Sequence, residues 1–141
     1  MLDAWSRRVV GWAIDRRATT AMVNAAIRMA VENRQLVDET LLHSDHGPQY
    51  TAWGFSQQLQ QAGLTHSLGS VGDAYDNAVV ESFWGRMQTE LLNTKRWKTR
   101  IELSSAMFDY IEFYNQTRRH SALGYLAPAE FERRQRKPQA A

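Results

Sequence analysis

Apolar residues recur along the chain at two spacings, one typical of strands and one typical of helices. Three short runs rich in β-branched or leucine side chains, at 6–14, 39–44 and 64–68, each predict a strand. Apolar positions three or four residues apart predict helices at about 20–31, 51–62, 75–92 and 102–115. This order of strands alternating with helices predicts an α/β domain.

Residues with strong end preferences support several of these boundaries. Thr19 or Thr20 offers a hydroxyl N-cap for the first helix, and Gly63 stops the second one. In the long helix over 75–92, the apolar positions share one stripe, which predicts the face that packs into the core. The residues of this stripe are Val80, Phe83, Met87 and Leu91.

Composition narrows the class of protein. The chain has 141 residues, about one domain, and its hydrophobic fraction of 43% is ordinary for a globular protein. It has no cysteine, which excludes a disulfide framework and a cysteine-based zinc site. The longest apolar run, around 9–14, is far shorter than the ~20 residues of a membrane helix. We therefore expect a soluble, cytoplasmic protein.

The distribution of charge is more informative than the net charge of +2. Residues 1–81 carry 6 basic and 9 acidic side chains, whereas residues 82–141 carry 11 basic and 6 acidic ones. An acidic centre followed by a basic third suits an enzyme that binds metal ions and a phosphate backbone. A drift of surface charge along the chain is the more common cause of such an asymmetry.

Two carboxylates stand out by position. Asp45 follows a predicted buried strand, at the strand end where α/β folds gather their catalytic groups. Glu81 comes one position after Val80, about 100° round the helix from the core stripe, at the edge of the packed face. Two such carboxylates could converge on Mg²⁺. By spacing alone, surface or capping roles are more common for residues of this kind.

The residues around these acids resemble a known family. The segments 43–50 (HSDHGPQY) and 72–83 (GDAYDNAVVESF) closely resemble the last two blocks of the DDE transposase and integrase core, in the bacterial insertion-sequence branch that is similar to retroviral integrase. The 35 residues between Asp45 and Glu81 match the spacing of that branch. Further resemblance covers 3–12 (DAWSRRVVGW), 113–125 (FYNQTRRHSALGY) and 128–131 (PAEF).

The resemblance implies a fold, a chemistry and partners. The fold would be ribonuclease-H-like, a mixed sheet flanked by helices. Asp45 and Glu81 would be the second and third members of the catalytic carboxylate triad and would bind two Mg²⁺ or Mn²⁺ ions. The reaction would be cleavage and strand transfer of transposon-end DNA. The partners would be transposon-end and target DNA and further copies of the chain.

The sequence departs from the family pattern at its beginning. The family's first catalytic Asp lies on the first, central strand, upstream of the hairpin that opens this chain. We therefore expect residues 1–132 to be an integrase core without that strand, followed by a frayed basic tail over 133–141. Asp3 matches a different family position, beside a basic turn, and is not expected to bind metal.

This departure leaves three hypotheses for the isolated chain. In the first hypothesis, the chain is inactive alone and requires a missing N-terminal segment or a full-length transposase. Alternatively, it is a non-catalytic fragment that binds DNA or a transposase, or it is an inactive gene remnant.

Two groups of basic residues are candidate DNA contacts. Lys95, Lys98 and Arg100 surround Trp97 in a short linker, which indicates either a DNA-backbone contact with a stacking ring or a solvated turn whose Trp packs into the core. Arg118, Arg119 and His120 lie in the family signature, where we expect DNA contact. Structural pairing with Asp or Glu is the alternative for this second group.

Three weaker hypotheses concern the flanks of the acidic blocks. His43 and His46 have a spacing that is only weakly indicative of zinc in a chain without cysteine. A place for His46 beside the metal ions, as a proton or water positioner, is the other hypothesis for that residue. By resemblance, the glycine-flanked loop 69–72 is a mobile loop that contacts DNA, and a flexible connection is the alternative.

Overall fold

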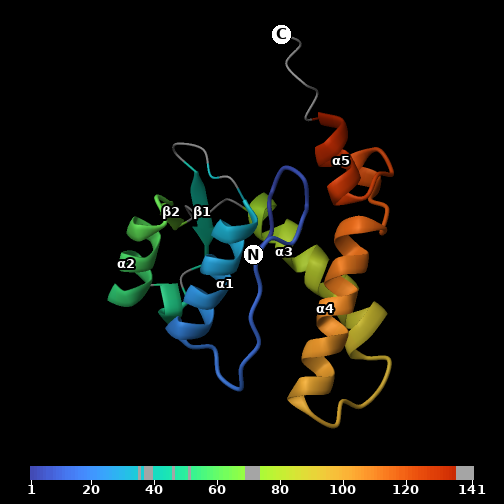
Figure 1. Cartoon of the computed structure of the whole chain (residues 1–141), viewed down its shortest axis with the longest axis horizontal. Coiled ribbons are helices and arrows are strands. Elements are labelled where there is room, and N and C mark those ends of the chain that lie inside the picture. The colour runs from blue at the N-terminus through green and yellow to red at the C-terminus, as the bar shows by residue number, and fades with distance from the viewer. Residues whose placement is uncertain (35, 37–39, 46, 51, 69–73, 136–141) are drawn as a thin grey trace. The chain divides into compact units, whose positions relative to one another are not determined.

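The computed structural model of the chain describes residues 1–34, 36, 40–45, 47–50, 52–68 and 74–135 (Figure 1). These residues fall into two compact units. The first unit contains Met1 and residues 10–78, and the second contains residues 2–9 and 79–141. Within the described residues, no helix combines the length and apolar character that a membrane span requires.

The first unit holds two helices and a small parallel sheet (Figure 1). Strands β1 and β2 run in the same direction, with Leu41 opposite Thr65 and Ser44 opposite Leu68. Parallel neighbours need a crossover connection, and α2 provides it. The elements are α1 (Thr20–Asn33), β1 (Leu41–Ser44), the 3₁₀ turn η1 (Pro48–Tyr50), α2 (Trp53–Gln61) and β2 (Thr65–Leu68).

Local sequence signals set the ends of these helices. The Thr19 hydroxyl accepts a hydrogen bond from the Met22 N–H at 3.2 Å, which caps α1 as predicted. Gly63 adopts φ +67°, a left-handed conformation that glycine tolerates, just after the end of α2. The predicted stop at Gly63 is confirmed.

One apolar cluster joins the elements of the first unit. Val23 and Ile27 of α1 pack with Phe55 and Leu59 of α2, and all four side chains are buried. Leu42 of β1 is among the partly buried residues that pack against this cluster. Burial of these side chains holds β1 in place and so fixes the position of its carboxyl end.

The second unit is mainly helical. It contains the end of α3 (Ala74–Met87), the π-helical turn η2 (Gln88–Leu92), α4 (Arg100–Gln116), the 3₁₀ turn η3 (Ser121–Leu123) and α5 (Pro128–Gln135). Phe83 and Met87 of α3 are buried as predicted, and Leu91 is partly buried. Val80, predicted to lie in the same stripe, is 43% exposed. The Phe83 ring meets the Tyr114 ring of α4 edge to face, with centroids 5.0 Å apart.

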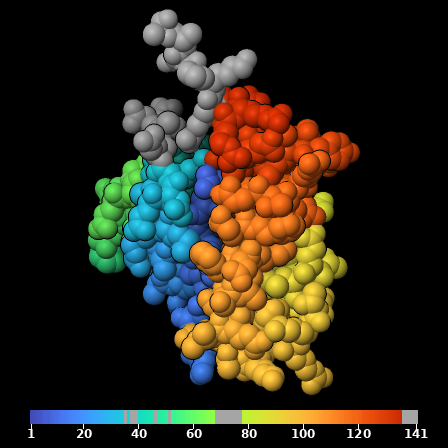
Figure 2. All heavy atoms as spheres, turned by 45° about the vertical axis from the view of Figure 1, so that its right-hand side comes forward, coloured from blue at the N-terminus to red at the C-terminus, as the bar shows by residue number. Residues whose placement is uncertain are grey.

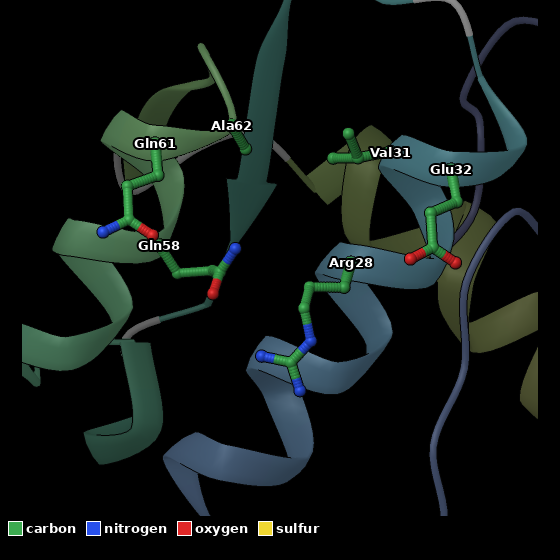
Figure 3. Close-up of a pocket in the computed structure, with 6 residues that line it drawn as sticks. All are labelled: Arg28, Val31, Glu32, Gln58, Gln61 and Ala62. Carbon is green, nitrogen blue, oxygen red and sulfur yellow. The ribbon is translucent and has the colours of Figure 1, made fainter.

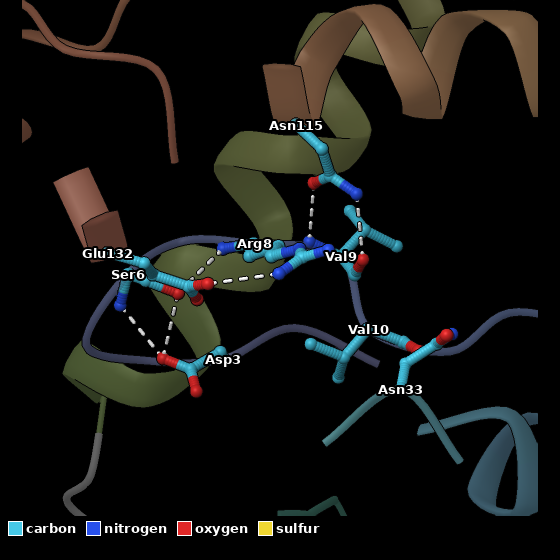
Figure 4. Close-up of polar contacts among 8 residues, drawn as sticks. All are labelled: Asp3, Ser6, Arg8, Val9, Val10, Asn33, Asn115 and Glu132. Atoms are coloured by element: carbon cyan, nitrogen blue, oxygen red, sulfur yellow. Dashed lines mark hydrogen bonds and ion pairs between the residues drawn. The ribbon is translucent and has the colours of Figure 1, made fainter. Parts of the chain in front are cut away.

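The segment 6–14 is not a strand, so that prediction is wrong. In its place, residues 2–9 form a tight hairpin in which Leu2 pairs with Val9 through an isolated antiparallel bridge. The outer partner of Val9 is a side chain: the Asn115 Oδ1 accepts from the Val9 N–H, and the Asn115 Nδ2 donates to the Val9 carbonyl, both at 2.9 Å (Figure 4). A buried amide thus makes the two bonds that a neighbouring strand would make.

The helix α5 was not predicted separately, although its ends carry standard signals. Pro128 occupies the first helical position, and Arg133 and Arg134 lie in the last turn. The helix includes 133–135, the first residues of the predicted frayed tail, and 136–141 lie outside the described residues. The predicted α/β class is confirmed, and the boundary at residue 132 stays a prediction.

Candidate functional site

Asp45 is the first residue after β1, at the carboxyl end of a parallel strand, and it is exposed. Its Oδ1 accepts a hydrogen bond from the Gly47 N–H at 3.1 Å. A Cβ at position 47 would lie 2.8 Å from the Gln49 Oε1 and 3.1 Å from that same Oδ1. Glycine at this position therefore lets the turn close tightly around the carboxylate.

Three rings support the turn that carries Asp45. Tyr50 meets Phe55 with centroids 5.4 Å apart, and Phe55 meets His66 of β2 at 4.9 Å, both edge to face. Burial raises the pKa of Tyr50, and the negative charge of Asp45 raises it further. Burial lowers the pKa of His66, and His43 lowers it further, so His66 is neutral at pH 7.

Side chains of β1 and β2 complete this group. The Ser44 hydroxyl lies 2.8 Å from the His66 Nε2 and donates to the Asp45 carbonyl at 3.0 Å. We call Ser44, Asp45, Tyr50, Phe55 and His66 the Asp45 cluster. No ion pair to Asp45 is found among the residues that the structure describes, so its charge is not neutralised within them.

Glu81 lies on α3 in the second unit, and its side chain is exposed. Among the described residues it makes no hydrogen bond or ion pair. Asp45 belongs to the first unit and Glu81 to the second, so their predicted convergence stays a prediction. His46 and the loop 69–72 lie outside the described residues, as do the hypotheses that concern them.

Both carboxylates suit a hard divalent cation. Each is exposed, and hard cations such as Mg²⁺ prefer carboxylate oxygens and keep several waters. In the part of the chain that the structure describes, no group of three or more His, Cys, Asp or Glu side chains is arranged to hold a metal. Metal binding by Asp45 and by Glu81 stays a prediction.

Asp3 has a structural role in the hairpin. Its Oδ1 accepts from the Ser6 N–H at 2.8 Å and from the Ser6 hydroxyl at 3.1 Å (Figure 4). The same Oδ1 accepts from the Trp5 N–H at 3.0 Å. Arg7 takes φ 63° in the same turn. The carboxylate of Asp3 thus stabilises the turn that precedes Val9.

Arg118, a predicted DNA contact, binds an acid of its own unit. Its Nη2 lies 2.6 Å from the Glu90 Oε1, and its Nε lies 3.0 Å from the Oε2, so the pair is bidentate. The Tyr110 hydroxyl donates to the same Oε2 at 2.9 Å. Hydrogen bonding from Arg118 is the main cause that lowers the pKa of Glu90. The Arg118 side chain is only 17% exposed, which matches the structural alternative for this residue.

His120 is also packed into its unit, whereas Arg119 is exposed. The His120 ring meets the Tyr114 ring at 4.6 Å, close to edge to face. Burial, followed by the charges of Arg118 and Arg86, lowers the pKa of His120 to about 4. His120 is therefore neutral at pH 7, and Arg119 is the residue of this group that is open to a phosphate.

The linker before α4 is partly structural. The Lys95 Nζ lies 2.6 Å from the Glu102 Oε1 and 4.6 Å from the centre of the Trp97 ring. The Trp97 indole N–H donates to the Leu92 carbonyl at 3.1 Å. The side chains of Lys98 and Arg100 are exposed, and their contact with DNA stays a prediction, as it does for Arg119.

Two surface features escaped the sequence analysis. A shallow hollow lies between α1 and α2 and does not include Asp45 (Figure 3). It is lined by Arg28, Val31, Glu32, Gln58, Gln61 and Ala62. Helix α4, which is orange in Figure 2, carries large exposed apolar side chains, among them Ile101 (82%) and Phe108 (59%). Their spacing of seven residues is about two helical turns, so both lie on one face of α4. In the sequence, the stronger apolar pattern is that of the buried stripe of α4.

The chain matches known protein families and a solved structure. Two models described as "Integrase core domain" match residues 1–74 and 62–128. In fold, the chain is similar to a chain of the simian T-cell lymphotropic virus intasome in complex with the PP2A regulatory subunit B56 gamma. The TM-score is 0.65 at 14% sequence identity, over 90% of this chain and 44% of that one.

Relatives from insertion elements are closer in sequence. The chain is 35% identical over 133 residues to the transposase for insertion sequence element IS904 of Lactococcus lactis, covering 94% of this chain and 53% of the relative. It is 36% identical over 133 residues to transposase InsF of IS3A from Escherichia coli, covering 94% and 46%. It is 38% identical over 130 residues to the IS600 uncharacterized 31 kDa protein of Shigella sonnei, covering 92% and 48%.

The α/β fold is therefore that of the integrases, consistent with a ribonuclease-H-like core. The chain belongs to the integrase core domain family, and its resemblance to the DDE transposase core of insertion elements is confirmed. The chain spans about half the length of the relatives named above.

Proposed function

We propose that this chain is part of a transposase core and supplies two metal-binding carboxylates, Asp45 and Glu81, for cleavage and strand transfer of transposon-end DNA. The observation that carries the proposal is the match to transposases over 94% of the chain. The position of Asp45 supports the proposal. Its carboxylate is exposed, lies at the end of a parallel strand and makes no ion pair among the described residues.

The proposed chemistry is phosphoryl transfer assisted by Mg²⁺ or Mn²⁺. When bound, the ions activate a water or a DNA 3′-hydroxyl and stabilise the leaving oxygen. Asp45 and Glu81 would hold the ions, and the hydrogen bond from the Gly47 N–H orients the Asp45 carboxylate. Of the candidate DNA contacts, the exposed Lys98, Arg100 and Arg119 bind the phosphate backbone.

The remaining candidates act indirectly in this proposal. Lys95, Arg118 and His120 each contact a neighbour in their own unit, and in this proposal they support the surface that binds DNA. Partners of the whole protein are transposon-end DNA, target DNA and further copies of the chain.

Mn²⁺ binding tests the proposal directly. Mn²⁺ is paramagnetic, so electron paramagnetic resonance of the free ion gives its Kd for the purified chain. We expect Asp45→Asn and Glu81→Gln each to raise the Kd at least tenfold. Asp109→Asn and Glu112→Gln, which change exposed acids on α4 in the same way, are the matched controls and leave the Kd unchanged.

Nicking of plasmid DNA in Mn²⁺ adds a functional readout. We expect the isolated chain to be inactive and to contribute activity when a full-length relative carrying Asp45→Asn at the matching position is added. Equal Mn²⁺ binding by all variants would contradict the proposed site. In that case, DNA binding that weakens with salt and ignores Mn²⁺ would favour a non-catalytic DNA-binding fragment.

A further inference from the structure

We infer that Ser44 and His66 are positioning residues that hold Asp45 in the orientation for metal binding. This inference rests on the proposed function, in which Asp45 is a metal ligand. It assigns a role to two side chains on neighbouring strands, and it is carried by the hydrogen bonds of the Asp45 cluster.

The register of the sheet brings the two side chains together. Leu42 lies opposite His66, and Ser44 is two residues further along β1. Because side chains alternate between the faces of a strand, Leu42 and Ser44 lie on the same face as His66. The Ser44 Oγ thereby comes within 2.8 Å of the His66 Nε2.

The number of protons available shows which atom is the donor in the contact between Ser44 and His66. A serine hydroxyl has one proton, and Ser44 donates it to the Asp45 carbonyl at 3.0 Å. The Ser44 oxygen must then accept from His66, which assigns the imidazole proton to Nε2. Nε2 carries a proton in the neutral ring of this tautomer and in the protonated ring, so the bond does not depend on the charge of His66.

The His66 ring is itself fixed. Its edge-to-face contact with Phe55, at 4.9 Å, sets it against a side chain that is fully buried. Phe55 also meets Tyr50, and the Tyr50 N–H donates to the Gly47 carbonyl at 2.9 Å. The Gly47 N–H in turn donates to the Asp45 Oδ1.

Asp45 is therefore held at two points. Ser44 holds its carbonyl from the side of the sheet, and Gly47 holds its carboxylate from the side of the turn. Partners that orient a ligand in this way raise metal affinity because less motion is lost on binding, and removing them usually lowers affinity 10–100-fold.

Four variants separate positioning from general packing. Ser44→Ala removes both hydrogen bonds, and His66→Phe keeps a ring against Phe55 but removes the donor. We expect each to raise the Kd for Mn²⁺ about tenfold. His66→Gln keeps an N–H donor at about the same reach and restores the wild-type Kd. Ser67→Ala, on β2 and on the opposite face from His66, is the matched control and leaves the Kd unchanged.

A second measurement follows the hydrogen bond without metal. The ¹⁵N chemical shifts of His66 report which ring nitrogen carries the proton, and we expect the Nε2–H form in the wild type and a mixture of tautomers in Ser44→Ala. The Nδ1–H form in the wild type would overturn the inference. Thermal unfolding checks that each variant is folded.

The outcomes distinguish this inference from the proposed function. If Asp45→Asn leaves Mn²⁺ binding unchanged, the proposed metal site is wrong and the inference fails with it. If Asp45→Asn abolishes binding while Ser44→Ala and His66→Phe bind Mn²⁺ as the wild type does, the metal site stands and the positioning role alone is overturned.

Discussion

Two acidic side chains, one in each unit, show opposite ways of placing a carboxylate. Glu90 in the second unit receives hydrogen bonds from Arg118 and Tyr110, and the Arg118 cation neutralises its charge. Asp45 in the first unit receives one backbone N–H, from Gly47, and has no cation beside it among the described residues.

The difference separates a structural acid from a candidate metal ligand. An acid whose charge is already paired stabilises the fold and has little affinity left for Mg²⁺. An acid that is held by backbone and left unpaired retains its charge for a cation from solution. We therefore expect substitutions that break the pair of Glu90 and Arg118 to change stability, and substitutions at Asp45 to change metal binding.

The largest loss of stability is expected for Asn115→Ala. The substitution removes two buried hydrogen bonds and leaves the Val9 N–H and carbonyl without that partner, which costs about 3 kcal/mol. Asn33→Ala is the matched control: its single bond to the Val10 carbonyl is exposed, so we expect a loss below about 1 kcal/mol. Urea unfolding measures both, and equal losses would contradict the assigned role of Asn115.

Arg118→Met is expected to cost about 2 kcal/mol, because Glu90 loses charge-assisted hydrogen bonds. Arg119→Met, one residue further on and exposed, changes the free energy of unfolding by less than about 0.5 kcal/mol. For DNA affinity we expect the reverse order, with the larger loss in Arg119→Met. That variant should also reduce the slope of the logarithm of the binding constant against the logarithm of the salt concentration by about the amount of one phosphate contact. Similar effects of both variants on stability would contradict the comparison between the paired Arg118 and the exposed Arg119.

The pH dependence of stability tests the packing of His120. Its pKa is lowered from 6.5 to about 4 in the fold, so below pH 6.5 the unfolded chain takes up a proton that the folded chain does not. The contribution of His120 to stability is therefore complete above pH 6.5 and is lost as the pH drops towards 4. His120→Gln should flatten this fall in urea midpoints measured at constant ionic strength. Glu90, whose pKa lies below its ordinary 4.5, acts only at lower pH.

Asp45→Asn should have the smallest effect on stability. Asparagine keeps an Oδ1 that accepts from the Gly47 N–H, so the free energy of unfolding changes by less than about 0.5 kcal/mol. The same variant removes Mn²⁺ binding in our proposal. Destabilisation by more than about 1 kcal/mol would show that Asp45, like Glu90, has a structural role.

Features with local causes could be predicted from the sequence. The Thr19 cap and the stop at Gly63 depend on residues within one helical turn, and both are found as expected. The position of Asp45 at a strand end followed from the apolar run before it, and the family motif supported it. The buried stripe containing Phe83 and Met87 followed from helical periodicity.

Features with distant causes could not be predicted. The strand over 6–14 failed because the partner of Val9 is an amide 106 residues away, which no local pattern reveals. The pairing of Arg118 with Glu90 depends on the π-helical turn and on the packing of Tyr110. His66 was not singled out because only the strand register brings it to Ser44.

The contact between Val9 and Asn115 also bears on how the chain is made. A ribosome adds roughly 5–20 residues per second, so Asn115 is synthesised roughly 5–20 s after Val9, from which it is 106 positions away. During that delay residues 2–9 lack the helix that holds them, while 10–78 can already collapse around Ile27 and Phe55. We therefore expect residues 2–9 to become protected from proteases only after α4 has been synthesised.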